Sequence, residues 1–264
     1  MKLLVMVATL RDDPVKLIES LDRQGDVVTV IGIVCGSSEF AEMLRSRYAR
    51  MTNIHVLYLK PDLSQLLGQR IAAALNFGFE HFDLDDYDYL LRIDADSVVP
   101  DGYILRNLPG DKQYVTGHTS GILIKMESFS KLLGGRYPVE NCEDAILSLR
   151  LTLHGFENIT TERIILLRVG GGGKDWRYWY QNGNLLYRIG AEPLHFAFGS
   201  LMRVLEERQP LRVFQILGCF VYMIKRVKKL EDVAPWVYTT WAHFNFSHIP
   251  MVLRKWTIVV SRRN

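Results

Sequence analysis

Residues 3–93 alternate between short apolar runs and segments with helical periodicity, and this alternation limits the folds open to the chain. The apolar runs lie at residues 3–8, 27–34, 54–59 and 89–93. Runs of this length that are rich in branched residues are typical of buried strands. Strands that alternate with helices predict a mostly parallel sheet with helices packed on its faces. The sequence therefore indicates an α/β fold for this part of the chain.

The segments between the apolar runs indicate where helices begin and end. Asp13 and Pro14 predict a helix start, because Asp is a favoured N-cap and Pro fits the first helical position. That helix is expected to end near Gly25, and Gly155 is placed to end a later helix as its C-cap. Beyond residue 100 the order of elements changes. We expect further helices at 39–50, 65–82 and 143–153, and further strands at 122–124 and 164–169.

Two carboxylates follow the fourth apolar run. Asp94 and Asp96 come directly after the expected strand at 89–93, so they should lie at the carboxyl edge of the sheet, where open α/β folds bind ligands. Such hard oxygen ligands suit Mg²⁺ or Mn²⁺, which usually also holds substrate phosphates. The alternative is a strand-end turn with solvated carboxylates. The same Asp-x-Asp spacing occurs twice in residues 83–88, where we expect a solvated acidic loop.

The composition limits the class of protein, and the cysteines indicate the cellular compartment. Hydrophobic residues make up 48% of the chain and charged residues 23%, which indicates a globular protein with a sizeable core. Cys35, Cys142 and Cys219 are far apart and show no metal-binding spacing, so we expect a reducing, cytoplasmic compartment. The apolar run at the N-terminus is shorter than the core of a signal peptide and is expected to be the first strand.

The C-terminal part of the chain differs in charge from the rest. Residues 203–264 carry eleven Lys and Arg against four Asp and Glu, a net charge of +7, whereas the preceding residues carry a net −4. Tryptophan mixed with basic residues around apolar stripes is typical of helices that lie in a membrane interface. We therefore expect residues 1–200 to form a catalytic domain. Residues 201–264 should form a basic, Trp-rich amphipathic helical appendage, peripheral at the cytoplasmic face of an anionic membrane.

Two other interpretations of this tail stay open. Its helices could pack as a hairpin on the catalytic domain with a solvated basic face, or the basic residues could bind nucleic acid. No nucleic-acid-binding motif supports the latter, so we expect no nucleic acid partner. The apolar run at 213–224 is too short to cross a bilayer.

Four segments, in order, resemble the motifs of the family 2 glycosyltransferases, which are inverting enzymes with the GT-A fold. Asp94-Ala95-Asp96 resembles the family's Asp-x-Asp motif, and residues 119–125 resemble its acceptor-side strand. Residues 143–156 resemble the acidic pair and the helix that it opens, and residues 176–188 resemble an aromatic segment seen in many members. The resemblance covers roughly residues 3–190.

This resemblance implies a metal-dependent hexosyltransferase. It would use Mg²⁺ or Mn²⁺ and move a sugar from a UDP- or GDP-sugar to a hydroxyl of a lipid-linked or glycan acceptor. Two departures concern the nucleotide site. Cys35 stands where the family usually has an acidic residue, and Thr9-Leu10-Arg11 stands where the first strand usually ends in an aromatic residue and Asn.

The resemblance also assigns roles to residues. Asp96 and Asp94 would hold the metal, and Asp144 would be the general base that takes the proton of the acceptor hydroxyl. Glu143 would be a second candidate base or a helix cap. Nucleotide or diphosphate contacts are expected from Thr9, Arg11, Cys35, Arg70, Asp94 and Trp179, although Arg70 could equally lie on a solvated helix face.

Several features have two interpretations. Gly170–Gly173, with Trp176 and Trp179, would close as a lid or form a surface loop. His118 and His195 would be structural or would complete the metal site. A nucleotidyltransferase on a related fold is an alternative function, but the segment after the first strand lacks the glycines that it needs. A membrane-associated scaffold without activity is another, and the intact carboxylates argue against it.

Overall fold

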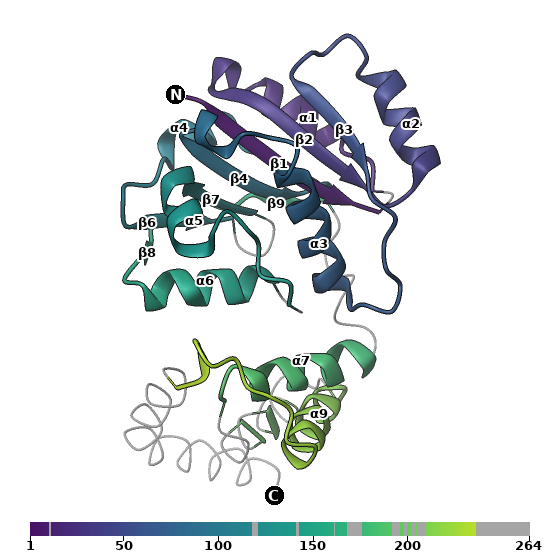
Figure 1. Cartoon of the computed structure of the whole chain (residues 1–264), viewed down its shortest axis with the longest axis vertical. Coiled ribbons are helices and arrows are strands. Elements are labelled where there is room, and N and C mark those ends of the chain that lie inside the picture. The colour runs from purple at the N-terminus through teal and green to yellow at the C-terminus, as the bar shows by residue number, and fades with distance from the viewer. Residues whose placement is uncertain are drawn as a thin grey trace, which may run out of the picture. The chain divides into compact units, whose positions relative to one another are not determined.

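The chain divides by packing into two compact units. A computed structural model describes residues 1–10, 12–117, 121–140, 143–160, 162–167, 176–191, 196–197, 200–201, 204 and 210–235. The units are Met1–Val169 and Gly170–Asn264 (Figure 1). The packing division therefore lies before the helix that begins at Trp176. Our boundary at residue 200 concerns the extent of the catalytic domain and stays a prediction.

The first unit is built on a seven-stranded sheet with the strand order β3-β2-β1-β4-β7-β6-β8. The strands β3, β2, β1 and β4 are parallel to one another, and β7 runs antiparallel to both of its neighbours. This confirms an α/β fold with a mostly parallel sheet. The strands are β1 (Leu3–Thr9), β2 (Val28–Cys35), β3 (Ile54–Tyr58), β4 (Tyr89–Asp94), β6 (Gln113–Thr116), β7 (Gly121–Lys125) and β8 (Glu157–Asn158).

Two further strands form a small antiparallel sheet, in which β5 (Ser97–Val98) pairs with β9 (Ile165–Leu166). The predicted strand at 164–169 is therefore only two residues long within the described part of the chain. Its backbone also reaches the acidic segment, because the Leu167 amide donates to the Asp96 carbonyl at 2.8 Å. This contact fixes the backbone just beyond β4.

The helices that the sequence predicted in the first unit begin and end close to the expected positions, whereas the helices at 103–106 and 126–133 were not predicted. α1 begins at Val15 with Pro14 as its N-cap, one residue later than predicted, and Asp13 Oδ1 accepts from the Val15 amide at 3.1 Å. Gly155 follows α6 with a φ of +77°, which only glycine adopts readily, and so acts as the predicted C-cap. The helices are α1 (Val15–Asp22), α2 (Ser38–Arg47), α3 (Leu67–Phe79), α4 (Tyr103–Arg106), α5 (Met126–Leu133) and α6 (Glu143–Leu153), with 3-10 turns η1 (Gly25–Val27) and η2 (Leu84–Asp86).

The sheet is covered on both faces, and β1 shows why. Leu3, Val5 and Val7 belong to an apolar cluster with residues of α1 and α2. Leu4 and Met6 belong to a second cluster with residues of α3, α5 and α6. Successive strand residues point to opposite faces, so a strand between two helical layers must be apolar throughout. The acidic loop at 83–88, by contrast, is largely exposed, as predicted.

The second unit contains two described helices that pack on each other, α7 (Trp176–Arg188) and α9 (Arg212–Ile224). Among the described residues, no helix combines the length and the apolar character needed to cross a membrane.

Candidate functional site

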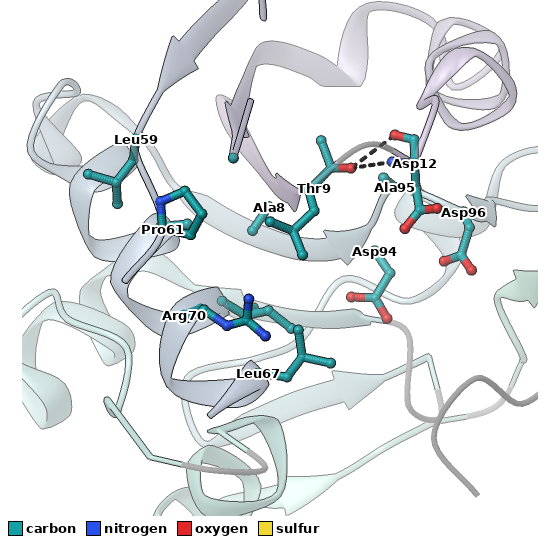
Figure 2. A pocket seen from close by; sticks show the side chains of 14 residues that line it. Ala8, Thr9, Asp12, Leu59, Pro61, Leu67, Arg70, Asp94, Ala95 and Asp96 are labelled. Atoms are coloured by element: carbon teal, nitrogen blue, oxygen red, sulfur yellow. Dashed lines mark hydrogen bonds between the residues drawn. The ribbon is translucent and has the colours of Figure 1, made fainter. Parts of the chain in front are cut away.

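The main candidate site is a pocket at the point where the strand order of the sheet reverses. The chain passes from β1 outward to β2 and β3, then returns to place β4 on the other side of β1. The carboxyl ends of β1 and β4 lie at this switch point, where open α/β folds bind their ligands. A cavity of about 230 Å³ lies there, between these strand ends and α3 (Figure 2).

Asp94 and Asp96 both line this pocket, as does the buried Ala95 between them. Asp12, from the segment after β1, lies beside them. Figure 2 shows Asp12 and Asp96 at one end of the pocket, with Arg70 further along it. The pocket therefore has an acidic end and a basic side chain within it.

Thr9 shapes the acidic end. Its buried hydroxyl accepts from the Asp12 amide and donates to the Asp12 carbonyl, both at 2.9 Å. These two bonds tie Asp12, which lines the pocket, to the end of β1. Thr9 lines the pocket as well. Arg11, the other predicted contact from this segment, lies outside the described residues.

Arg70 brings a hydrogen-bond donor to the pocket. It lies in the first turns of α3, where Gln69 Oε1 accepts from the Leu66 amide at 3.0 Å and so fixes the start of the helix. The Arg70 Nε is buried and has no hydrogen-bond partner among the described residues. An unsatisfied buried donor is costly, and a bound anion would satisfy it.

A buried arginine joins this pocket to the acidic pair on α6. Arg92 Nη1 lies 2.9 Å from Asp94 Oδ1, as an ion pair without hydrogen-bond alignment. Arg92 Nη2 donates to Glu143 Oε1 at 3.0 Å. Arg92 and Asp94 are two residues apart on β4 and so point to the same face of the sheet. Residues far apart in the sequence thus share one guanidinium.

Sequence reasoning missed Arg92, although a signal was present. Arg92 lies within the run expected to be a buried apolar strand. A charged residue at the centre of such a run is rarely tolerated unless it is paired. The Arg in Leu-Leu-Arg-Ile therefore implied a buried acidic partner. Glu143 is that partner.

The two acidic residues that open α6 have different surroundings. Glu143 is buried against Arg92, whereas Asp144 is half-buried and its Oδ1 accepts from the Ala145 amide at 2.8 Å. Neighbouring helix residues point about 100° apart, so only one of them can face Arg92. Glu143 is thus an internal carboxylate, and Asp144 is the one that solvent or a substrate can reach.

The buried carboxyl groups hold their protons more tightly than exposed ones. Burial raises the pKa of Asp94 to about 6 and that of Glu143 to about 7, even though Arg92 lowers both. Asp96 and Asp144 contribute to the higher pKa of Asp94, and Asp144 to that of Glu143. A single guanidinium serves several carboxylates. The cluster therefore has more negative than positive charge and would favour an added cation.

Asn76 fixes the segment that leads into α6. Its side chain donates to the Tyr137 carbonyl at 3.0 Å and accepts from the Tyr137 amide at 2.6 Å. Tyr137 is buried close enough to Arg92 for their charges to interact, and burial raises the pKa of its hydroxyl above its ordinary value. Asn76 thus has a structural role in this unit.

Other predicted residues lie elsewhere. Cys35 is buried in the apolar cluster that contains residues of α1 and α2, on the sheet face opposite to α3. Burial there raises its thiol pKa to about 11. Gly36, the next residue, lines the pocket instead. Trp179 belongs to the second unit, where the Arg212 guanidinium lies 4.7 Å from its ring centre, and its nucleotide contact stays a prediction. Gly170–Gly173, His118 and His195 lie outside the described residues.

The acidic end of the pocket could supply part of a metal site. No group of three His, Cys, Asp or Glu among the described residues is arranged to hold a metal ion. Mg²⁺ and ions like it are, however, often bound by only one or two carboxylates, with water and substrate phosphates as the other ligands. Asp94 and Asp96 fit that incomplete set.

Comparison of the chain with models of known protein families gives no match, and comparison with curated proteins gives no significant match either. The case for a function therefore rests on the residues of the site and on the motif resemblance.

Proposed function

We propose that the protein is an inverting glycosyltransferase of the GT-A type, which moves a sugar from a nucleotide-diphosphate donor to a hydroxyl group. The observation that carries this proposal is the pocket at the strand-order reversal. It is lined by Asp94, Asp96 and Arg70, whose Nε has no partner in the part of the chain that the structure describes. The four motifs in order support it. Two of them, the Asp-x-Asp segment and the acidic pair of α6, meet through Arg92.

The donor diphosphate would lie between the two ends of the pocket. Asp94 and Asp96 would hold Mg²⁺ or Mn²⁺, which neutralises negative charge on a departing diphosphate. Arg70 would donate to a phosphate oxygen from the other side. Apolar residues on α3 and after β3, including Leu67, Ile71 and Leu59, complete the lining. They offer an apolar surface to the nucleoside or the sugar of a UDP- or GDP-sugar.

Asp144 would be the general base. Its carboxylate would accept the proton of the acceptor hydroxyl while that oxygen bonds to the anomeric carbon and the bond to the diphosphate breaks. Glu143 would act as a positioning residue, because its contact with Arg92 fixes the start of α6 relative to β4. A lipid-linked or glycan hydroxyl would be the acceptor.

A donor screen tests the proposal. The full-length protein is incubated with Mn²⁺ and a panel of UDP- and GDP-sugars, and release of nucleoside diphosphate and the melting temperature are both measured. A true donor should raise the melting temperature, because a ligand that binds only the folded state stabilises it. Asp96→Ala should abolish this effect. Asp85→Ala, in the exposed turn η2, is the matched control and should not.

The products separate the alternatives. Release of pyrophosphate from a nucleoside triphosphate and a sugar phosphate would instead support a nucleotidyltransferase. If no donor is cleaved and none raises the melting temperature, the glycosyltransferase proposal is wrong.

A further inference from the structure

The helix α9 carries apolar side chains on the side that faces away from α7. Its buried residues are Gln215, Gly218 and Cys219. Met223 is 36% exposed, and three apolar residues are more exposed: Val213, Leu217 and Ile224, with 49%, 50% and 74% of their surface exposed. Residues four and eleven positions apart lie on the same side of an α-helix. We call these three residues the outward stripe.

The contact between α7 and α9 is closest at two glycines. A Cβ atom on Gly183 would lie 2.0 Å from the Gln215 carbonyl oxygen, and one on Gly218 would lie 2.1 Å from the Tyr180 carbonyl oxygen. The helix backbones therefore meet where only glycine fits. Gln215 Oε1 and Asn184 Oδ1, the latter next to Gly183 in the sequence, are buried without a hydrogen-bond partner among the described residues.

Together these features differ from the usual pattern of a helix pair in water, which packs large apolar residues together and exposes polar ones. Here the closest approach is made by glycines, beside a small apolar cluster that includes Tyr187 and Cys219, while three large apolar residues of α9 are exposed. Close contact through small residues is typical of helices that associate in lipid. The outward stripe therefore fits an apolar environment.

A basic segment follows the stripe directly. Lys225, Arg226, Lys228 and Lys229 are exposed at the end of α9. Arg226 has a φ of +49°, a left-handed conformation in which glycine is strongly favoured. Turn geometry therefore does not explain why an arginine stands at this position. Its exposed positive charge is what a glycine would lack.

We infer that the outward stripe and this basic segment bind the surface of an anionic membrane, with α9 lying along it. The stripe would enter the apolar boundary while the basic side chains contact lipid phosphates. Exposed Trp176, whose ring centre lies 5.5 Å from that of Phe214 on α9, adds an aromatic of the kind found at such interfaces. With 13 residues, α9 is about 20 Å long and cannot cross about 30 Å of hydrocarbon.

This inference does not depend on the proposed sugar transfer and is tested without it. The full-length protein is floated with vesicles of phosphatidylcholine alone or mixed with phosphatidylglycerol. Flotation should require the anionic lipid. It should weaken between about 0.01 M and about 1 M salt, as the Debye length falls from about 30 Å to about 3 Å.

Two variants separate the apolar and the basic contributions. Ile224→Glu changes the most exposed residue of the stripe and should lower the bound fraction several-fold without changing the melting temperature. Met43→Glu, on α2 with 40% of its surface exposed, is the matched control and should have no effect. Arg226→Gly should weaken binding about five-fold, yet leave the melting temperature unchanged or higher, because the backbone strain is removed.

Three outcomes would overturn the inference. The first is no flotation at any salt. The second is equal flotation with neutral vesicles, which would exclude a role for the basic segment. The third is a lower melting temperature of Ile224→Glu and Leu217→Glu together with unchanged flotation, which would mean that the stripe packs against protein.

Discussion

The two units of this protein distribute apolar residues differently. In the first unit, apolar side chains fill both faces of the sheet, and the main charged group inside, Arg92, contacts two carboxylates. In the second, glycines lie at the closest approach of α7 and α9 beside a small apolar cluster, and three large apolar side chains of α9 are exposed. The total content of hydrophobic residues does not distinguish the two units. They differ in which side of each helix or strand carries the hydrophobic residues.

The largest effect on stability is expected at the buried ion pairs of the first unit. Arg92→Met would leave Glu143 and Asp94 without their cation, and removing one partner of a buried pair typically costs about 3–5 kcal/mol. We expect a loss of this size in the free energy of unfolding, measured with urea and followed by circular dichroism.

An exposed pair provides the control. Arg47 lies 2.7 Å from Asp13 in a pair that solvent reaches, and such pairs contribute about 0–1 kcal/mol. Arg47→Met should therefore change the free energy of unfolding much less. Similar losses in the two variants would show that the burial of the Arg92 cluster is unimportant for stability.

Much of the first unit could be predicted from the sequence because its signals are local. The alternation of strands and helices follows from periodicity, and α6 begins and ends where its acidic residues and Gly155 indicate. The link between Arg92 and Glu143 is not local. It depends on which strand lies beside which helix, and no single-sequence pattern encodes that.

The second unit was less accessible to sequence reasoning for a related reason. The sequence indicated apolar stripes in the tail, but not which stripe would face a neighbouring helix. Gly183 lies in a segment that motif reasoning assigned to the catalytic domain, so its contact with Gln215 was not foreseen. Apolar residues at helical spacing can therefore be exposed when their helix packs against its neighbour by another face.

The second prediction separates two neighbours, one inside the first unit and one at its surface. Asp144→Asn should lower turnover at least a hundredfold with donor binding near normal, as expected for loss of a general base. Glu143→Gln should lower turnover less, and more of its effect should be on stability, because Glu143 contacts Arg92. Single-turnover kinetics with the donor found in the screen provide the measurement. The reverse ranking would make Glu143 the base.

The third prediction compares a helix glycine from each unit. An alanine at Gly183 would meet the backbone of α9, whereas one at Gly78 would meet the side-chain ends of Met6 and Val34. Side-chain ends can shift and backbone cannot. We expect Gly183→Ala to cost about 1–3 kcal/mol and Gly78→Ala less.

Tryptophan fluorescence makes this comparison specific. All five tryptophans lie in residues 170–264, so fluorescence reports the second unit and circular dichroism can follow Gly78→Ala. A Gly183→Ala variant as stable as the parent protein would show that α7 and α9 do not meet as closely as the structure has them.

The smallest effect concerns pH. Burial raises the pKa of Glu143 to about 7, whereas an unfolded glutamate has a pKa of about 4.3. Between these values the folded state holds a proton that the unfolded state has released, so the free energy of unfolding falls as pH rises. Urea unfolding in chelator buffer should therefore show a loss on the order of 1 kcal/mol from Glu143 between about pH 5.5 and about pH 7.5. Glu143→Gln cannot titrate and should have a shallower slope over this range. An equal slope in both proteins would mean that Arg92 keeps Glu143 ionised throughout, and that the cluster carries its full negative charge next to the pocket.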